Sequence, residues 1–121
     1  MPDSVWQPGM PTGVILVTGP DPAAIRDAGR IGQLLERMDK NDVRLVVNRL
    51  TSELISVLDI TVDDIMDQAG LPLLGVVPED PCVLLAAAKE KPLLKATRRG
   101  AAAACRRIAR RMRGQRVRIR L

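Results

Sequence analysis

Three short apolar runs alternate along the chain with segments whose apolar residues recur at helical spacing. The runs are residues 13–18, 44–48 and 73–77. Their apolarity is continuous rather than alternating, so each run predicts a strand covered on both faces, as in a parallel sheet. Strands that alternate with helices predict an α/β fold with about three mainly parallel strands. A doubly wound sheet usually has more strands, so we expect this sheet to be partial.

The first helix is predicted directly after residues 21–22, where an N-cap aspartate precedes a proline that suits the first helical turn. Apolar residues then recur at helical spacing and predict the face that packs on the sheet. These residues are Ile25, Ala28, Ile31, Leu35 and Met38.

Further helices are marked by their ends. Residues 51–57 predict a short helix, and Thr61 with Asp64 forms a capping-box pattern for the next one, which Gly70 ends. Residues 80–81 repeat the pairing of an N-cap aspartate with a proline and open a helix that runs to about residue 89.

The last helix is predicted to begin at the cap Thr97 and to stop at Gly114. One face carries an apolar stripe and the opposite face is basic. The stripe is Ala101, Ala104, Cys105, Ile108 and Met112, and the basic face is Arg106, Arg107, Arg110, Arg111 and Arg113. Residues 116–121 then alternate with period two, which is typical of a strand.

Charge divides the chain into an acidic body and a basic end. Ten arginines and no acid lie between residues 98 and 121, whereas nine basic residues face fourteen acidic ones in the rest of the chain. The basic end predicts an anionic partner, which is a membrane, a nucleic acid or an acidic protein surface. The alternative is a solvated helix face and a frayed end. Candidate anion-binding residues are Arg106, Arg107, Arg110, Arg111, Arg113, Arg116, Arg118 and Arg120.

Composition excludes several kinds of site. The chain has no histidine, which removes an imidazole base, a Ser-His triad and a His-ligated zinc. Cys82 and Cys105 lie far apart and indicate small buried side chains rather than a zinc site or a disulfide. No apolar run approaches the ~20 residues of a membrane span, and the first residues lack the pattern of a signal peptide. We therefore expect a cytoplasmic protein, with peripheral binding at the inner face of the membrane as an additional location.

Three segments in order resemble the MinD branch of the ParA/MinD ATPases. They are 17–30 (VTGPDPAAIRDAGR), 44–49 (RLVVNR) and 71–80 (LPLLGVVPED). The resemblance covers about residues 13–113, which we interpret as one half-domain between a flexible segment, 1–12, and a basic tail, 114–121. It implies the C-terminal half of a P-loop NTPase-like fold and a role in positioning the cell-division septum.

The resemblance also implies a binding site for the adenine of ATP. Asn48 corresponds to the family residue that hydrogen-bonds the base, and Arg49 follows it near the ring. Pro78, Glu79 and Asp80 correspond to the loop that covers the other side of the base. The position is physically reasonable because ligands lie outside the carboxyl ends of the strands in open α/β sheets. Without the family, Asn48 reads as a turn residue, Arg49 as a solvated charge and Pro78 as a strand end.

The groups that would hold the phosphates have no counterpart in these 121 residues. A P-loop requires a Gly-Lys dipeptide, and the chain contains none. Residues 1–9 also differ from the family motif that orients magnesium. ATP and Mg²⁺ are the cofactors that the resemblance implies, and we expect neither productive binding nor hydrolysis by this chain alone.

Two functions are consistent with these residues. In the first, the chain is the adenine-side half of a septum-positioning ATPase, and its partners are an N-terminal half or a second copy, the other Min proteins and an anionic membrane surface. The lost half would leave apolar sheet edges and one sheet face exposed, as would also follow if the chain were a degenerate gene product with no independent role. In the second, a non-catalytic basic module docks on nucleic acid or anionic membrane through its arginines. Nucleic acid is the less favoured partner because Tyr, Phe, helix-turn-helix and zinc-finger patterns are missing.

Overall fold

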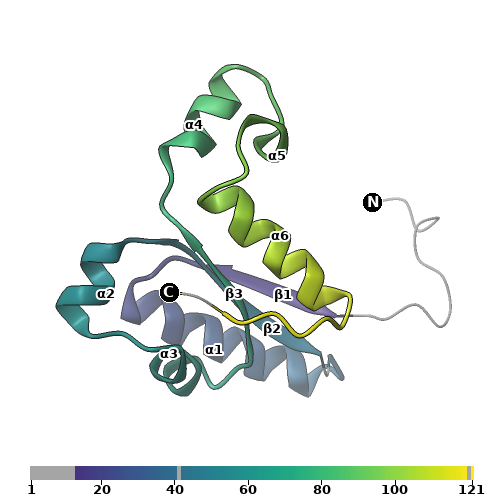
Figure 1. The fold of residues 1–121 in the computed structure, drawn as a ribbon. Helices are drawn as coiled ribbons and strands as arrows, with labels where there is room; N and C mark the ends of the chain where they lie inside the picture. Colours follow the sequence, from purple (N-terminus) through teal and green to yellow (C-terminus); the bar gives the residue numbers. More distant parts are fainter. Residues whose placement is uncertain (1–12, 41, 120) are drawn as a thin grey trace, which may run out of the picture.

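The computed structural model describes residues 13–40, 42–119 and 121 (Figure 1). Its sheet has three parallel strands in the order β1-β2-β3, which confirms the predicted partial α/β sheet. The predicted segment 1–12 lies outside the described residues. The strands are β1 (Val14–Thr18), β2 (Val43–Leu50) and β3 (Leu73–Pro78).

Helices cover both faces of this sheet (Figure 1). The helices are α1 (Pro22–Arg37), α2 (Ser52–Leu58), α3 (Val62–Ala69), α4 (Pro81–Ala88), α5 (Leu93–Ala96) and α6 (Ala101–Met112). Helices α1 and α3 pack together on one face, and α6 packs on β3 from the other. Helices α4 and α5 contact each other and project from the sheet beyond the end of β3 (Figure 1). None of the described helices is long and apolar enough to cross a bilayer.

Side-chain caps confirm the predicted starts of α1 and α3. Asp21 accepts a hydrogen bond from the N–H of Ala24 at 3.3 Å. Thr61 and Asp64 exchange both bonds of the capping box, at 3.1 and 3.0 Å. Gly70 ends α3 with a left-handed backbone at φ 68°, which glycine adopts without steric cost.

The expected cap of the last helix is wrong. The hydroxyl of Thr97 accepts from the N–H of Arg99 at 3.2 Å, which makes a turn before the helix, and the N-cap residue of α6 is Gly100. The short helix α5 is a second difference. The sequence pattern assigns Pro92 to the end of the preceding helix, but this proline is the N-cap of α5. Residues 115–119 carry no regular structure, so the alternating pattern in that segment does not produce a strand.

The main core lies between the sheet and the α1–α3 layer, where Leu45 and Val47 of β2 are fully buried. Only part of the predicted apolar stripe of α1 is buried: Ile31 and Met38 are exposed. Its buried face includes two glycines instead. A Cβ atom at Gly29 would collide with the carbonyl oxygen of Ala69, and one at Gly32 would come within 2.8 Å of Leu71. The helix therefore approaches α3 more closely than larger side chains would allow.

The expectation that every strand is covered on both faces is wrong for β1. Ile15 and Val17 are 41% and 63% exposed, although β2 and β3 are largely buried. Helix α6 buries Ala101, Ala102 and Ala104, but its last predicted stripe residue, Met112, is exposed. Within the described residues, β1 is an edge strand with an exposed face, which agrees with the sheet surface expected of a half-domain.

Candidate functional site

The pairing of β2 with β3 changes register just where β2 ends. Val47 pairs with Val76, but Leu50 pairs with Pro78, so β2 uses one residue more than β3 over this stretch. The extra residue lies in the two-residue stretch Asn48–Arg49, between these two pairs. A bulge of this kind bends a strand and re-aims its side chains, and bulges are frequent beside binding sites.

The backbone of Arg49 is left-handed, with φ 61°. A non-glycine residue rarely adopts this conformation, which costs roughly 1–2 kcal/mol. The neighbouring side chain supports it locally, because Oδ1 of Asn48 accepts a hydrogen bond from the N–H of Arg49 at 2.9 Å. This bond fixes the Asn48 amide in one orientation. Its NH₂ group donates no hydrogen bond to any described residue, so two donors and a second lone pair of Oδ1 stay available to a ligand.

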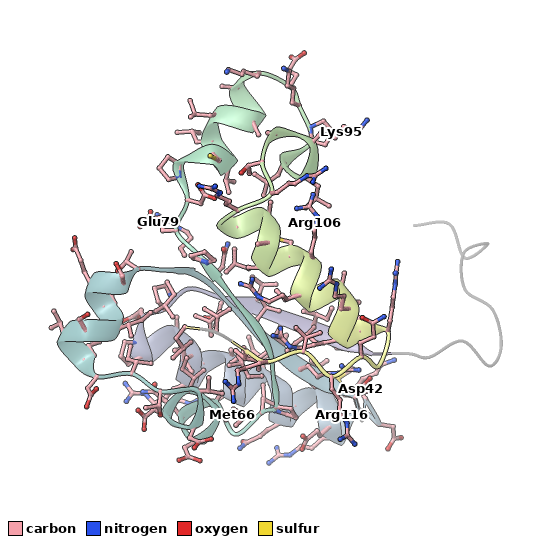
Figure 2. The ribbon with its side chains drawn as sticks, viewed as in Figure 1. Asp42, Met66, Glu79, Lys95, Arg106 and Arg116 are labelled. Atoms are coloured by element: carbon pink, nitrogen blue, oxygen red, sulfur yellow. The ribbon has the colours of Figure 1, made fainter. Side chains whose placement is uncertain are left out.

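The loop after β3 lies against this turn. Glu79 donates its backbone N–H to the carbonyl oxygen of Leu50 at 3.0 Å. Its carboxylate lies 3.5 Å from the guanidinium of Arg49, and the two side chains are 51% and 72% exposed. An exposed pair contributes little stability, but it links the two strand ends. Figure 2 shows Glu79 where the chain leaves the sheet toward α4.

Asp80 has a different role from its neighbours in the loop. Its two carboxylate oxygens accept hydrogen bonds from the N–H of Cys82 at 2.9 Å and of Ala101 at 3.0 Å. The bond from Ala101, followed by that from Cys82, lowers the pKa of the Asp80 carboxyl below its ordinary value. Asp80 thus holds the starts of α4 and α6 together. It lies at the end of the loop that contains Pro78 and Glu79.

The structure therefore brings four of the predicted base-site residues together at the carboxyl ends of β2 and β3. These are Asn48, Arg49, Pro78 and Glu79. Among the described residues no group of three or more His, Cys, Asp or Glu side chains could hold a metal ion. The strand ends offer donors and acceptors suited to a nucleotide base.

The predicted anion-binding arginines lie on α6 and the segment after it. Four are on α6, Arg113 is its C-cap, and two follow in the tail, whereas Arg120 lies outside the described residues. Arg111 does not share the solvent-facing side that the pattern assigned to it. Its guanidinium donates to the carbonyl oxygens of Leu74, Val117 and Arg118.

Solved structures of the MinD/ParA class of ATPases superpose on this chain. The MinD cell division protein of Aquifex aeolicus superposes with a TM-score of 0.79 at 30% identity, over 88% of this chain and 45% of that one. MinD of Pyrococcus horikoshii, complexed with Mg-ADP, gives 0.68 at 27% identity over 81% and 40%. A ParA family ATPase of Chlorobium tepidum gives 0.61 at 22% identity and shows the shared fold. The sheet and its helices therefore have the P-loop NTPase-like MinD/ParA fold.

Within this class, the sequence relatives of the chain are MinD proteins. The septum site-determining protein MinD of Synechocystis sp. is 38% identical over 103 residues, and the chloroplastic MinD homologue of Arabidopsis thaliana is 41% identical over 81 residues. No family model matches the chain. The chain spans 39% and 25% of the length of these two relatives. It belongs to the MinD branch of the MinD/ParA family and corresponds to the C-terminal part of MinD.

Proposed function

We propose that this chain is the base-binding part of a MinD-like nucleotide switch that helps to position the division septum. The observation that carries the proposal is the strained turn of Asn48 and Arg49, joined to the loop of Pro78 and Glu79 at the carboxyl edge of a parallel sheet. Ligands of open α/β sheets lie at this edge. The chain's relatives are septum site-determining proteins, and one relative of known structure is complexed with Mg-ADP.

Asn48 has the groups that adenine recognition needs. The amide NH₂ donates to a ring nitrogen, and the free lone pair of Oδ1 accepts from the exocyclic amine. Its bond to the N–H of Arg49 holds the amide in place before a ligand arrives, which lowers the entropy cost of binding. Pro78 offers a rigid apolar surface to the ring, and the Arg49–Glu79 pair keeps the two strand ends together.

The groups that bind phosphate and Mg²⁺ come from elsewhere in the assembled protein. The sequence contains no Gly-Lys dipeptide, and phosphoryl transfer depends on positioning and on electrostatic stabilisation of the γ-phosphate. We therefore propose that ATP and Mg²⁺ bind productively only when an N-terminal MinD-like part joins this one. A second copy and a MinC-type partner then associate with the assembled switch, by analogy with the MinC:MinD complex of Aquifex aeolicus. We place this assembly in the cytoplasm and at the inner face of the membrane.

Calorimetric titration of ADP with Mg²⁺ tests the proposal. The chain is titrated alone and after mixing with the N-terminal part of a MinD relative. We expect no measurable heat from the chain alone and saturable binding by the mixture. Asn48→Ala in the mixture should weaken binding by about tenfold, which is the loss expected for one or two hydrogen bonds.

Gln33→Ala is the matched control, because Gln33 is an exposed amide on α1. It should leave ADP binding unchanged. Micromolar ADP binding by the chain alone would contradict the proposal that the phosphate-binding groups come from the N-terminal part. Equal affinity of the Asn48→Ala mixture and the wild type would remove Asn48 from the base site.

A further inference from the structure

A hollow of about 350 Å³ lies between the outer side of α6 and the segment that follows this helix. It is lined by arginines around two apolar side chains, and it shares no residue with the base site. The lining residues are Arg98, Ala103, Arg106, Arg107, Arg110, Val117 and Arg118. A volume of this size is typical of sites that take small molecules.

The spacing of the α6 residues explains why they converge. Ala103, Arg106, Arg107 and Arg110 follow one another at i, i+3, i+4 and i+7, so they share one side of the helix. The small side chain of Ala103 leaves room among the longer ones. Figure 2 shows Arg106 on the side of α6 that faces α5, where its guanidinium donates to the carbonyl oxygen of Leu94 at 2.8 Å.

The opposite wall of the hollow is held in place by Arg111. This guanidinium donates to the carbonyl oxygen of Val117 at 2.8 Å, to that of Arg118 at 2.6 Å, and to that of Leu74 in β3 at 2.9 Å. Ile119 next along the chain packs against the core. Arg111 thus links the tail to β3 and holds Val117 and Arg118 opposite α6.

The hollow concentrates positive charge that no acid balances. The described residues form three salt bridges, which involve Arg30, Arg44 and Arg49. None of them involves an arginine that lines the hollow. The pKa of Arg111 is lowered, first by burial and then by the charge of Arg107. Like charges gathered in a concave surface raise the local potential, and an anion that entered would relieve their repulsion.

We propose that this hollow binds a compact multivalent phosphate, carried either by a soluble polyphosphorylated molecule or by a phosphomonoester lipid headgroup. Arg107, Arg110 and Arg118 make the direct contacts, because guanidinium groups match phosphate oxygens in pairs. Arg98 and Arg106 flank the ligand, and Arg111 is a positioning residue. A concave site favours a compact ligand over the extended backbone of a nucleic acid, whose phosphates need contacts spread along a surface.

The test titrates inorganic tripolyphosphate into the complete 121-residue chain by calorimetry. The paired charge reversal Arg107→Glu with Arg110→Glu changes two lining residues. The control pair, Arg113→Glu with Arg116→Glu, changes net charge equally at exposed positions outside the hollow. We expect saturable binding by the wild type, a loss of roughly tenfold or more in the first pair, and a change of at most about threefold in the control. Circular dichroism checks that each variant stays folded.

A second comparison changes shape without charge. Ala103→Leu places a larger side chain inside the hollow, whereas Ala109→Leu adds the same group at an exposed α6 position outside it. Only the first should weaken tripolyphosphate binding. Undiminished binding by Ala103→Leu, non-saturable binding by the wild type, or equal losses in the two charge-reversed pairs would each overturn the proposal.

Vesicles that contain phosphatidic acid separate the two sources of phosphate. If a lipid headgroup is the ligand, the wild type sediments with the vesicles and tripolyphosphate releases it. The Arg107→Glu/Arg110→Glu variant then stays in solution, whereas the control pair still sediments. If the ligand is soluble, tripolyphosphate binding follows the expected pattern while vesicle binding falls equally in both pairs. Both patterns support the site, and neither depends on adenine binding at Asn48.

Discussion

The carboxylate of Asp80 accepts a hydrogen bond from the backbone N–H of Ala101 at 3.0 Å, across 21 residues of chain. Gly100 makes this approach possible, since its φ is 59° and a Cβ atom there would collide with the Asp80 carboxylate. The bond ties the first turn of α6 to the loop that follows β3. One residue therefore links the loop of Pro78 and Glu79 to the helix that carries the arginine-lined hollow.

Replacing Asp80 should destabilise the chain more than replacing an exposed aspartate. Asp80→Ala removes the acceptor for two helix starts, whereas Asp27→Ala removes only an exposed pair with Arg30. We expect the urea midpoint to fall by roughly 0.5 M or more in the first variant and to change little in the second. Equal midpoints for the two variants would show that the bonds of Asp80 do not support the fold.

The contribution of Asp80 should depend on pH with a defined sign. Its hydrogen bonds lower the pKa in the folded chain below the ordinary value of 3.8. The carboxylate therefore adds stability that is complete above that value and is lost as the pH falls through the folded pKa. The difference in urea midpoint between wild type and Asp80→Asn should be constant from neutral pH to about pH 5 and shrink below the ordinary pKa. A difference that grows on acidification would contradict this sign.

Gly29→Ala should destabilise the protein, although helix propensity alone predicts the reverse. Alanine favours a helix interior by about 1 kcal/mol over glycine. At Gly29, however, the added Cβ would collide with the backbone oxygen of Ala69, which cannot move without shifting α3. Overpacking costs about 1–3 kcal/mol, and a clash with backbone belongs at the upper end of that range. Once the gain in helix propensity is subtracted, we expect a net loss of roughly 1–2 kcal/mol in the free energy of unfolding.

Gly19→Ala is the control for this substitution. A Cβ atom at Gly19 would meet nothing within 4 Å, and the backbone there is not left-handed. We expect a change within about 0.5 kcal/mol in urea unfolding. A stabilised Gly29→Ala protein would mean that α1 and α3 do not approach each other as closely as described.

The strands and most helix starts could be predicted because their signals are local. The caps at Asp21 and Thr61 depend on residues three positions apart, and each apolar run coincides with a strand to within a few residues. The face of α1 could not be predicted in the same way. Glycines at positions 29 and 32 carry no hydropathy signal, and their burial depends on where α3 lies.

The site could be predicted only in part, because it depends on contacts between distant segments. Asn48 and Glu79 were located by resemblance to a family, but the bulge beside them depends on the register between β2 and β3. The role of Arg111 depends on a carbonyl oxygen 37 residues away, so periodicity alone placed this residue on the wrong side of the helix. The i, i+3, i+4, i+7 spacing of Ala103 with three arginines was visible in the sequence, but the tail that closes the hollow was not.

The exposed face of β1 gives the sharpest test of the half-domain interpretation. Val17 is 63% exposed on this edge strand, and Val57 of α2 is 79% exposed on a helix. Because both side chains face solvent, Val17→Lys and Val57→Lys should each change the free energy of unfolding by less than about 1 kcal/mol. If the N-terminal part of MinD covers β1, a charge buried without a partner at position 17 opposes assembly. ADP binding by the mixture of the two parts should then be lost with Val17→Lys and kept with Val57→Lys. Equal behaviour of the two variants would mean that the joining surface lies elsewhere.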